Sequence, residues 1–449
     1  MLFSTEYTLL RGVIKSNTLQ LDCPIITLIL EGMFMNQSPL FLNIELLVGL
    51  SCWVLLINLT KHITLKRNII LFGSIIFYLY FAGIQQFSLI AFIALLTFFA
   101  GKSQNSKLII TCIFLNLLAI VTSKWIVSQE LPTNSAMQSW IPLGVSFFVF
   151  EFIHYLVEVK RGMTPEKSVF GFITFAFFFP TVVSGPIRRY PTFAENLRTL
   201  KRTNWSDIEN GLASIGIGYI YKLMGDYCAV IQERSYNQGD FVGFDDGRIL
   251  ILCATLRIFL DFAGYSYIAI GFSRLIGIHI PRNFNAPYLA TSIIEFWNRW
   301  HISLSSWVRD YLYIPMGGSR VAFSRQAINL IISMVIIGLW HGYGSKFALW
   351  GALQGLALVV NHSFRRIRQR SRILLSTPLL MPPKIKKEIH KRSKTQPQVR
   401  VNRNLRVMIS LFSWFLTMTF VSISWLVFFY PPSEAWRIIQ SVFFQGVFN

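Results

Sequence analysis

The stretch AINLIISMVIIGLWHGYGSKFALWGALQGLALVV, residues 327–360, places a single histidine, His341, between two apolar runs. Each run comes close to the ~20 apolar residues that a helix needs to cross a ~30 Å hydrocarbon core. The glycines around the histidine favour a turn. The stretch therefore predicts two membrane helices, 327–341 and 345–361, with an ionisable side chain where burying a charge is costly.

The composition of the whole chain indicates the same class of protein. Of its 449 residues, 53% are hydrophobic and 14% are charged, and the mean hydropathy is +0.49. An average soluble domain carries about 25% charged residues. We therefore expect an all-α polytopic membrane protein with about 10–12 membrane segments. The further spans that we expect are 40–59, 69–84, 86–101, 108–127, 141–157, 211–231, 249–278 and 406–429, while the short stretch 23–35 is expected to lie in the interface.

The net charge of +21 is concentrated beside the apolar runs. Residues 361–406 hold 14 Lys and Arg against one acid, Glu388. This pattern is typical of cytoplasmic loops that contact anionic lipid headgroups, and it argues against a nucleic-acid partner. It predicts a basic cytoplasmic loop at 362–405. The same rule puts 61–67, 102–107 and 158–205 inside, and 84–86, 128–140 and 232–247 outside.

Two segments with broken apolar patterns are expected to enter the membrane and return to the same side. Residues 168–187 are apolar but contain Pro180, Gly185 and Pro186, and residues 290–325 are flanked by arginines. Broken backbone at membrane depth is tolerated only where protein or water covers its polar groups. The two segments therefore predict re-entrant helices around a central funnel or tunnel.

The second broken segment contains EFWNRWHISLSSWVRDYLY, residues 295–313. On one continuous helix, Trp300, Leu304, Trp307 and Tyr311 would form an apolar stripe, with Trp297, His301 and Ser305 in a row beside it. An interfacial amphipathic helix would account for the aromatic and charged residues without any chemistry. It would not account for a histidine among the aromatic rings.

His341 is the sharper candidate for chemistry. An intramembrane histidine stays neutral because desolvation disfavours its charged form, and a neutral imidazole can act as a general base. The glycines Gly338, Gly342 and Gly344 would let a substrate approach the backbone. The alternative is a neutral histidine hydrogen-bonded between helices. The sequence has no nucleotide-binding, zinc-protease or serine-hydrolase motif, and its five cysteines form no metal-binding pattern, so no metal is expected.

Several motifs together resemble the bacterial branch of the membrane-bound O-acyltransferases. They are DFAGYSYIAIG (261–271), IPRNFNAPYLATSIIEFWNRWHISLSSWVRDYLYIPMGGSR (280–320), IIGLWHGYGSKFALWGALQG (336–355), FFPTVVSGPIRRY (178–190) and WLVFFYPPSEAW (425–436). MGGSR is similar to the alginate O-acetyltransferase group. PTVVSGPIRRY and GYSY are closer to the D-alanyl transfer protein of teichoic acid synthesis, and Tyr267 and Tyr430 depart from the acetyltransferase pattern.

The resemblance implies a multi-pass enzyme of a bacterial cytoplasmic membrane that moves an acyl group, most simply acetyl, from a cytoplasmic thioester to a hydroxyl of an extracytoplasmic glycan. The donor would be acetyl-CoA or a phosphopantetheine carrier, with no bound cofactor, and an acyl-accepting partner protein is expected outside. D-alanyl transfer is the alternative, and an envelope-precursor transporter is an alternative of another class. The expected organisation is N-terminal membrane helices at 1–139 and a catalytic core at 140–445.

The resemblance also assigns roles to residues. His341 would take the proton of the acceptor hydroxyl, and His301 would orient the donor or stabilise the oxyanion. The supporting residues would be Asn298, Trp297, Trp300, Ser305 and Trp340, and the candidates for binding donor phosphates are Arg299, Arg309 and Arg320. Anchoring of helix ends would explain each arginine equally well.

Overall fold

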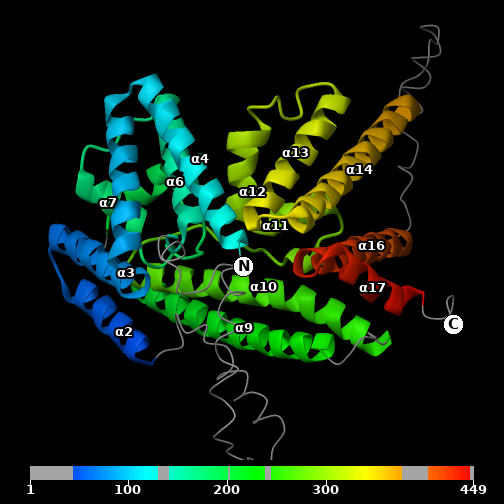
Figure 1. Cartoon of the computed structure of the whole chain (residues 1–449), viewed down its shortest axis with the longest axis horizontal. Coiled ribbons are helices and arrows are strands. Elements are labelled where there is room, and N and C mark those ends of the chain that lie inside the picture. The colour runs from blue at the N-terminus through cyan, green and yellow to red at the C-terminus, as the bar shows by residue number, and fades with distance from the viewer. Residues whose placement is uncertain (1–43, 130–140, 201–202, 238–243, 377–402, 445–449) are drawn as a thin grey trace, which may run out of the picture.

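The computed structural model describes residues 44–129, 141–200, 203–237, 244–376 and 403–444, and within them the chain is helical with no strand (Figure 1). The expected interfacial stretch 23–35 lies outside these residues. The elements are α2 (Ile44–Leu59), α3 (Ile63–Ser103), α4 (Ser106–Ser128), α6 (Val145–Lys160), α7 (Val169–Phe177), α8 (Tyr190–Arg198), α9 (Trp205–Asn237), α10 (Phe244–Leu275), η3 (Pro287–Leu289), α11 (Ile293–Arg299), α12 (Ile302–Val308), η4 (Arg309–Tyr313), α13 (Phe323–His341), α14 (Ser345–Ser376), α16 (Arg403–Phe429) and α17 (Pro432–Phe443).

Six helices in the described part of the chain are long and apolar enough to cross a membrane. They lie in α3, α4, α10, α13, α14 and α16, where the sequence predicts spans. The helices α2 and α6 also form where spans are expected, but each has 16 residues, which is short for a full crossing. α14 continues to Ser376, so the first part of the basic segment 362–405 is helical.

The element α3 agrees with the prediction of two apolar helices that meet near residue 84. Its 41 residues are two helices joined by a kink at Gly83, whose φ of 75° lies in the left-handed region that favours glycine. Apart from the adjacent backbone of its own helix, no atom of the described residues lies within 4 Å of the position that a Cβ on Gly83 would occupy. The bend therefore comes from the backbone of this glycine, and in Figure 1 the two arms of α3 point in different directions.

The first broken segment, 168–187, contains the nine-residue helix α7 followed by irregular backbone. Phe178, Phe179 and Val182 in the irregular part are all buried, so protein covers this backbone as the prediction requires. Arg188, directly after this segment, holds its C-terminal end in place. The Arg188 guanidinium donates to both carboxylate oxygens of Glu151 on α6, at 2.9 and 2.6 Å, and both side chains are buried.

The second broken segment is not the single helix expected over 295–313. α11 ends at Arg299, and α12 begins at Ile302. Hydrogen bonds to a neighbouring loop hold the chain on both sides of this break: the Asn285 N–H donates to the Arg299 carbonyl at 3.0 Å, and the Ile302 N–H donates to the Asn283 carbonyl at 2.9 Å. The break therefore depends on a contact with residues 283–285 that helical periodicity does not reveal.

The hairpin of α13 and α14 is closely packed. A Cβ on Gly338 would lie 2.1 Å from the Phe347 carbonyl oxygen, so this glycine lets the two helix backbones touch. The expectation that Gly338 leaves room for a substrate is therefore wrong. In Figure 1 the α13–α14 turn lies at the same end as the C-terminal end of α4, whereas the basic α3–α4 turn, η4 and the far end of α14 lie at the opposite end.

Candidate active site

The two candidate catalytic histidines both contact the ring of Trp340. The Trp340 ring centroid is 4.5 Å from that of His341, at the end of α13, and 5.9 Å from that of His301. α13 carries Trp340 and His341, while His301 comes from the break between α11 and α12. The fold therefore brings close to one ring two histidines that are 40 positions apart in the chain.

His301 occupies an unusual position in the backbone. Its φ of 41° and ψ of 53° place it in the left-handed region, which costs a residue with a side chain about 1–2 kcal/mol. Such strain persists only where the surroundings enforce it, and it concentrates at functional sites. The side chain is buried, and its Nε2 atom has no hydrogen-bond partner within the described residues. A buried imidazole nitrogen without a partner is available to a substrate.

Aromatic rings surround His341. Trp350 and Phe428 present T-shaped contacts to its imidazole, at centroid distances of 5.6 and 5.1 Å. Trp350 stacks in turn on Trp425 at 5.4 Å and meets Trp297 at 6.0 Å. The Trp297 indole N–H donates to the Gln354 Oε1 at 3.2 Å, so its orientation is fixed. These rings make the surroundings of His341 largely apolar.

Some of the supporting residues expected around His301 are buried and others are exposed. Trp300 is buried and packs on Trp425 at 5.0 Å, and the Ser305 hydroxyl donates to the Trp300 carbonyl at 3.1 Å. Asn298 is exposed on α11 instead of lying among the buried groups. A direct hydrogen bond to the reacting groups is therefore not supported for Asn298 in this conformation.

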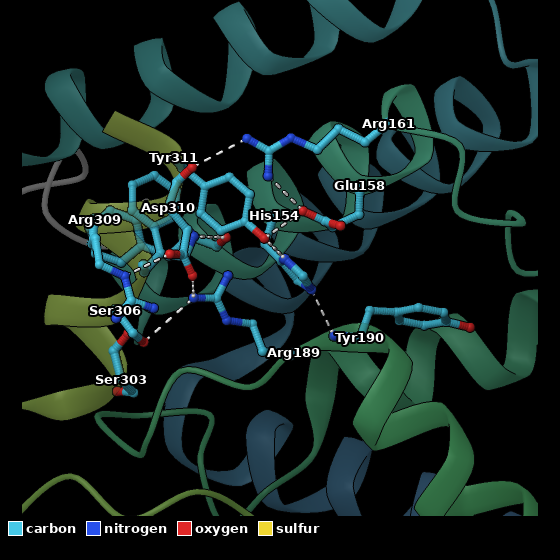
Figure 2. Close-up of polar contacts among 12 residues, drawn as sticks. His154, Glu158, Arg161, Arg189, Tyr190, Ser303, Ser306, Arg309, Asp310 and Tyr311 are labelled. Atoms are coloured by element: carbon cyan, nitrogen blue, oxygen red, sulfur yellow. Dashed lines mark hydrogen bonds and ion pairs between the residues drawn. The ribbon is translucent and has the colours of Figure 1, made fainter. Parts of the chain in front are cut away.

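The three arginines expected to bind donor phosphates do not form one cluster. Arg299 pairs with Glu295 on its own helix at 2.7 Å, and Arg320 is exposed. Arg309 instead adjoins a polar cluster built from α6, η4 and the start of α8 (Figure 2). It donates to Asp310 at 2.9 Å, and Arg189 donates to the same carboxylate at 3.0 Å.

A chain of hydrogen bonds orders this polar cluster. The Tyr190 N–H donates to the His154 Nε2 at 2.9 Å, so a neutral His154 carries its proton on Nδ1. That nitrogen lies 2.6 Å from the Tyr311 hydroxyl, which donates to Glu158 at 2.8 Å. The Arg161 side chain donates to Glu158 at 2.9 Å, and Figure 2 shows the whole chain. His154 is thus engaged by protein groups on both ring nitrogens.

Three basic residues with no role assigned from the sequence, Arg161, Arg189 and Lys124, lie over aromatic rings of the polar cluster and of the histidine site. Arg161 and Arg189 lie with their guanidinium carbons 5.1 and 4.9 Å from the Tyr311 ring centroid. Lys124 lies on α4 with its ammonium 5.9 Å from the Trp340 ring centroid. The signal that could have identified Lys124 is its position as a lone lysine inside an apolar run, because a charged group within a membrane segment is a candidate for function, as is His341.

Comparison with known proteins supplies independent observations. A family model described as MBOAT, membrane-bound O-acyltransferase, matches residues 86–382. A probable alginate O-acetylase of Azotobacter vinelandii is 39% identical over 228 residues, covering 50% of this chain and 45% of that protein. A peptidoglycan O-acetyltransferase of Helicobacter pylori is 28% identical over 318 residues, covering 64% and 54%.

A teichoic acid D-alanyltransferase of Streptococcus thermophilus is 29% identical over 269 residues, which cover 56% of this chain and 64% of that protein. The aligned part of this chain corresponds to 45% of the Azotobacter relative and 56% of a Pseudomonas aeruginosa one, about half the length of each. The family resemblance drawn from the motifs is confirmed, and both branches that it suggested are present among the relatives.

Proposed function

Because the chain belongs to the membrane-bound O-acyltransferase family, we propose that it transfers an acyl group from a thioester donor to a hydroxyl acceptor at the two histidines. The observation that carries this proposal is the contact of both His341 and His301 with the ring of Trp340. Two neutral imidazoles in an apolar environment provide a base and a hydrogen-bonding group, which acyl transfer needs.

In the proposed mechanism, His341 removes the proton of the acceptor hydroxyl as its oxygen attacks the thioester carbonyl carbon. The carbonyl oxygen becomes an oxyanion, and a hydrogen bond from His301 stabilises it. When the intermediate collapses, the carbon–sulfur bond breaks and the sulfur takes the proton from His341. The products are an ester and a thiol, and base assistance of this kind contributes about 10²–10⁴-fold.

We further propose that the donor reaches this site along α12. Asp310, in the arginine cluster, is nine residues from His301, which corresponds to about 13 Å at ~1.5 Å per residue. A CoA or phosphopantetheine donor carries its phosphates and its thioester at opposite ends of a long arm. Arg309, with Arg189 and Arg161, could bind the phosphates while the thioester lies beside His301.

The membrane arrangement in this proposal follows the charges. The end with the arginine cluster and the basic α3–α4 turn faces the cytoplasm, and the end with His341 faces outward. The six apolar helices and the shorter helices would make about 10–12 membrane segments around a funnel within a core at 140–445. The protein would then be a multi-pass enzyme of a bacterial inner membrane, with an acyl-accepting partner protein outside.

The acyl group and the acceptor are proposed as acetyl and an envelope glycan, since relatives are named for O-acetylation of alginate and of peptidoglycan. D-alanyl transfer from a carrier protein is the alternative, supported by the teichoic acid relative. Membranes supplied in parallel with radiolabelled acetyl-CoA and with a labelled D-alanyl carrier thioester separate the two, because label enters the envelope glycan from one donor only.

The test of the mechanism is the pair of substitutions His341→Ala and His301→Gln in the full chain. We expect loss of acyl transfer in both while insertion and abundance stay normal. Acylation at the wild-type rate in His341→Ala would refute the base assignment. Transport of an envelope precursor with no acylation by the unmodified protein would favour the transporter.

A further inference from the structure

Lys124 presents a cation to the end of the molecule that holds His341, and it has no acidic partner among the residues that the structure describes. Its ammonium donates to the His341 carbonyl oxygen at 3.4 Å and lies over the Trp340 ring. None of the ion pairs among the described residues includes Lys124. An ammonium has three N–H donors, and this contact uses one of them.

Lys346, on α14, also donates to a backbone carbonyl oxygen. It lies in the first turn of α14 and donates to the Phe429 carbonyl oxygen at 3.2 Å. Phe429 follows Phe428, whose ring packs on His341 at 5.1 Å. Lys346 is also absent from the ion pairs of the described residues. Two lysines, from α4 and α14, therefore approach the surroundings of His341 from different helices.

The basic groups at the other end of the molecule behave differently. Arg161 pairs with Glu158, and Arg189 and Arg309 share Asp310. Each of these guanidinium groups has a carboxylate partner, although the three of them share two carboxylates. Near His341, in contrast, two partly buried ammonium groups contact carbonyl oxygens and rings, and neither contacts a carboxylate in the described part of the chain. Keeping uncompensated charge in such a place costs free energy, which an incoming anion would recover.

We infer that Lys124 and Lys346 form an anion-binding site that holds an acidic group of the hydroxyl acceptor beside His341. The acidic group is a carboxylate or a phosphate, and both accept charge-assisted hydrogen bonds from ammonium groups. This inference rests on the proposed function for the identity of the acceptor. It adds that the enzyme selects acidic acceptors, and it names the residues that select them.

The experiment uses the full chain in nanodiscs with labelled acetyl-CoA, or the carrier thioester if that is the donor. Four small acceptors form two matched pairs: methyl glucuronide against methyl glucoside, and glycerol phosphate against glycerol. Lys124→Met and Lys346→Met remove the charge and keep an unbranched apolar stem. Lys107→Met, at an exposed position in the first turn of α4 at the opposite end of that helix, is the control.

We expect each Lys→Met variant near His341 to raise KM for one acidic acceptor about tenfold or more, since a charge-assisted hydrogen bond typically contributes that much. The values of kcat/KM for the neutral acceptors and all values for Lys107→Met should stay at wild-type levels. The acidic acceptor that is affected identifies the anion. Equal losses with acidic and neutral acceptors would overturn the inference, because they would indicate a structural role.

Binding provides a readout that does not require turnover. Methyl glucuronide or glycerol phosphate should raise the unfolding temperature of the wild-type protein and fail to raise that of the Lys124→Met, Lys346→Met double variant. If the wild type transfers no acyl group but shows this charge-dependent protection, the proposed function fails and the anion site stands. Absence of protection by either anion would refute the site.

Discussion

The buried pair of Glu151 and Arg188 provides the most quantitative test of the fold. It fixes the irregular backbone after α7 to α6, and the Arg188 guanidinium also lies over the rings of Phe175, Phe178 and Phe193 at 4.9–5.3 Å. Removing one member of such a pair leaves the other charge buried alone, at a cost of about 3–5 kcal/mol. We therefore expect Glu151→Leu and Arg188→Met each to lower the free energy of unfolding by about that amount.

The double variant should be much less damaging than the sum of the two. A methionine at 188 can keep the contact with the three rings, and no charge remains buried. The remaining cost is the Arg188 N–H, which donates to Glu151 at 3.0 Å and would lose its acceptor, at about 1–3 kcal/mol. The double-mutant cycle should therefore yield a coupling free energy between Glu151 and Arg188 of at least about 3 kcal/mol.

The assay is equilibrium unfolding in mixed micelles, followed by tryptophan fluorescence, for the wild type, both single variants and the double variant. Glu434→Gln is the control, because its partner Arg437 is more than half exposed and a pair of this kind contributes less than about 1 kcal/mol. Additive losses in the double variant would refute the reasoning, since they would mean that the two side chains stabilise the fold independently.

Two further predictions concern other contacts. Gly338→Ala should lower the free energy of unfolding by at least about 1–3 kcal/mol, because the new Cβ would meet the Phe347 carbonyl oxygen. Gly344→Ala is the control, since its Cβ would meet no such neighbour and the change should cost only backbone strain. Unfolding midpoints of the two variants compare them, and equal midpoints would contradict the packing argument. Burial alone would raise the pKa of the Glu166 carboxyl, but hydrogen bonds from Tyr190 and from the Ser168 and Lys167 N–H groups, together with the charge of Arg198, lower that pKa below its usual 4.5. The carboxylate therefore stabilises the fold above pH 4.5 and loses this effect as the pH falls through its lowered pKa, so the gap in unfolding temperature between wild type and Glu166→Gln should narrow on acidification; a gap independent of pH would rule this out.

Local sequence signals predicted much of the architecture. The apolar runs of α4, α13, α14 and α16 form helices at the expected places, and the prolines after α7 coincide with irregular backbone. These features depend on residues close together in the chain. The motifs containing His301 and His341 likewise identified the two histidines that meet at Trp340.

The remaining features depend on contacts between distant segments. The break at His301 involves hydrogen bonds with the loop at 283–285, so the continuous stripe expected through Trp300 was wrong, although Trp300, Leu304 and Trp307 are all buried. Nothing in the sequence around Gly338 indicated that the Phe347 carbonyl would occupy the space beside it. Lys124 was overlooked because its apolar run continued on both sides, and its nearness to His341 emerges only when α4 meets α13.

Ser303, the second residue of α12, joins three parts of the molecule. Its hydroxyl donates to the Asn283 Oδ1 at 2.6 Å and accepts a hydrogen bond from the Ile187 N–H at 3.0 Å, across 116 positions in the chain. During synthesis, the earlier segments must wait for α12 before this junction can close. His301 therefore acquires its left-handed backbone late, and His341, which is translated later still, completes the site. A nascent chain stalled before residue 303 should hold both earlier segments without a formed catalytic centre.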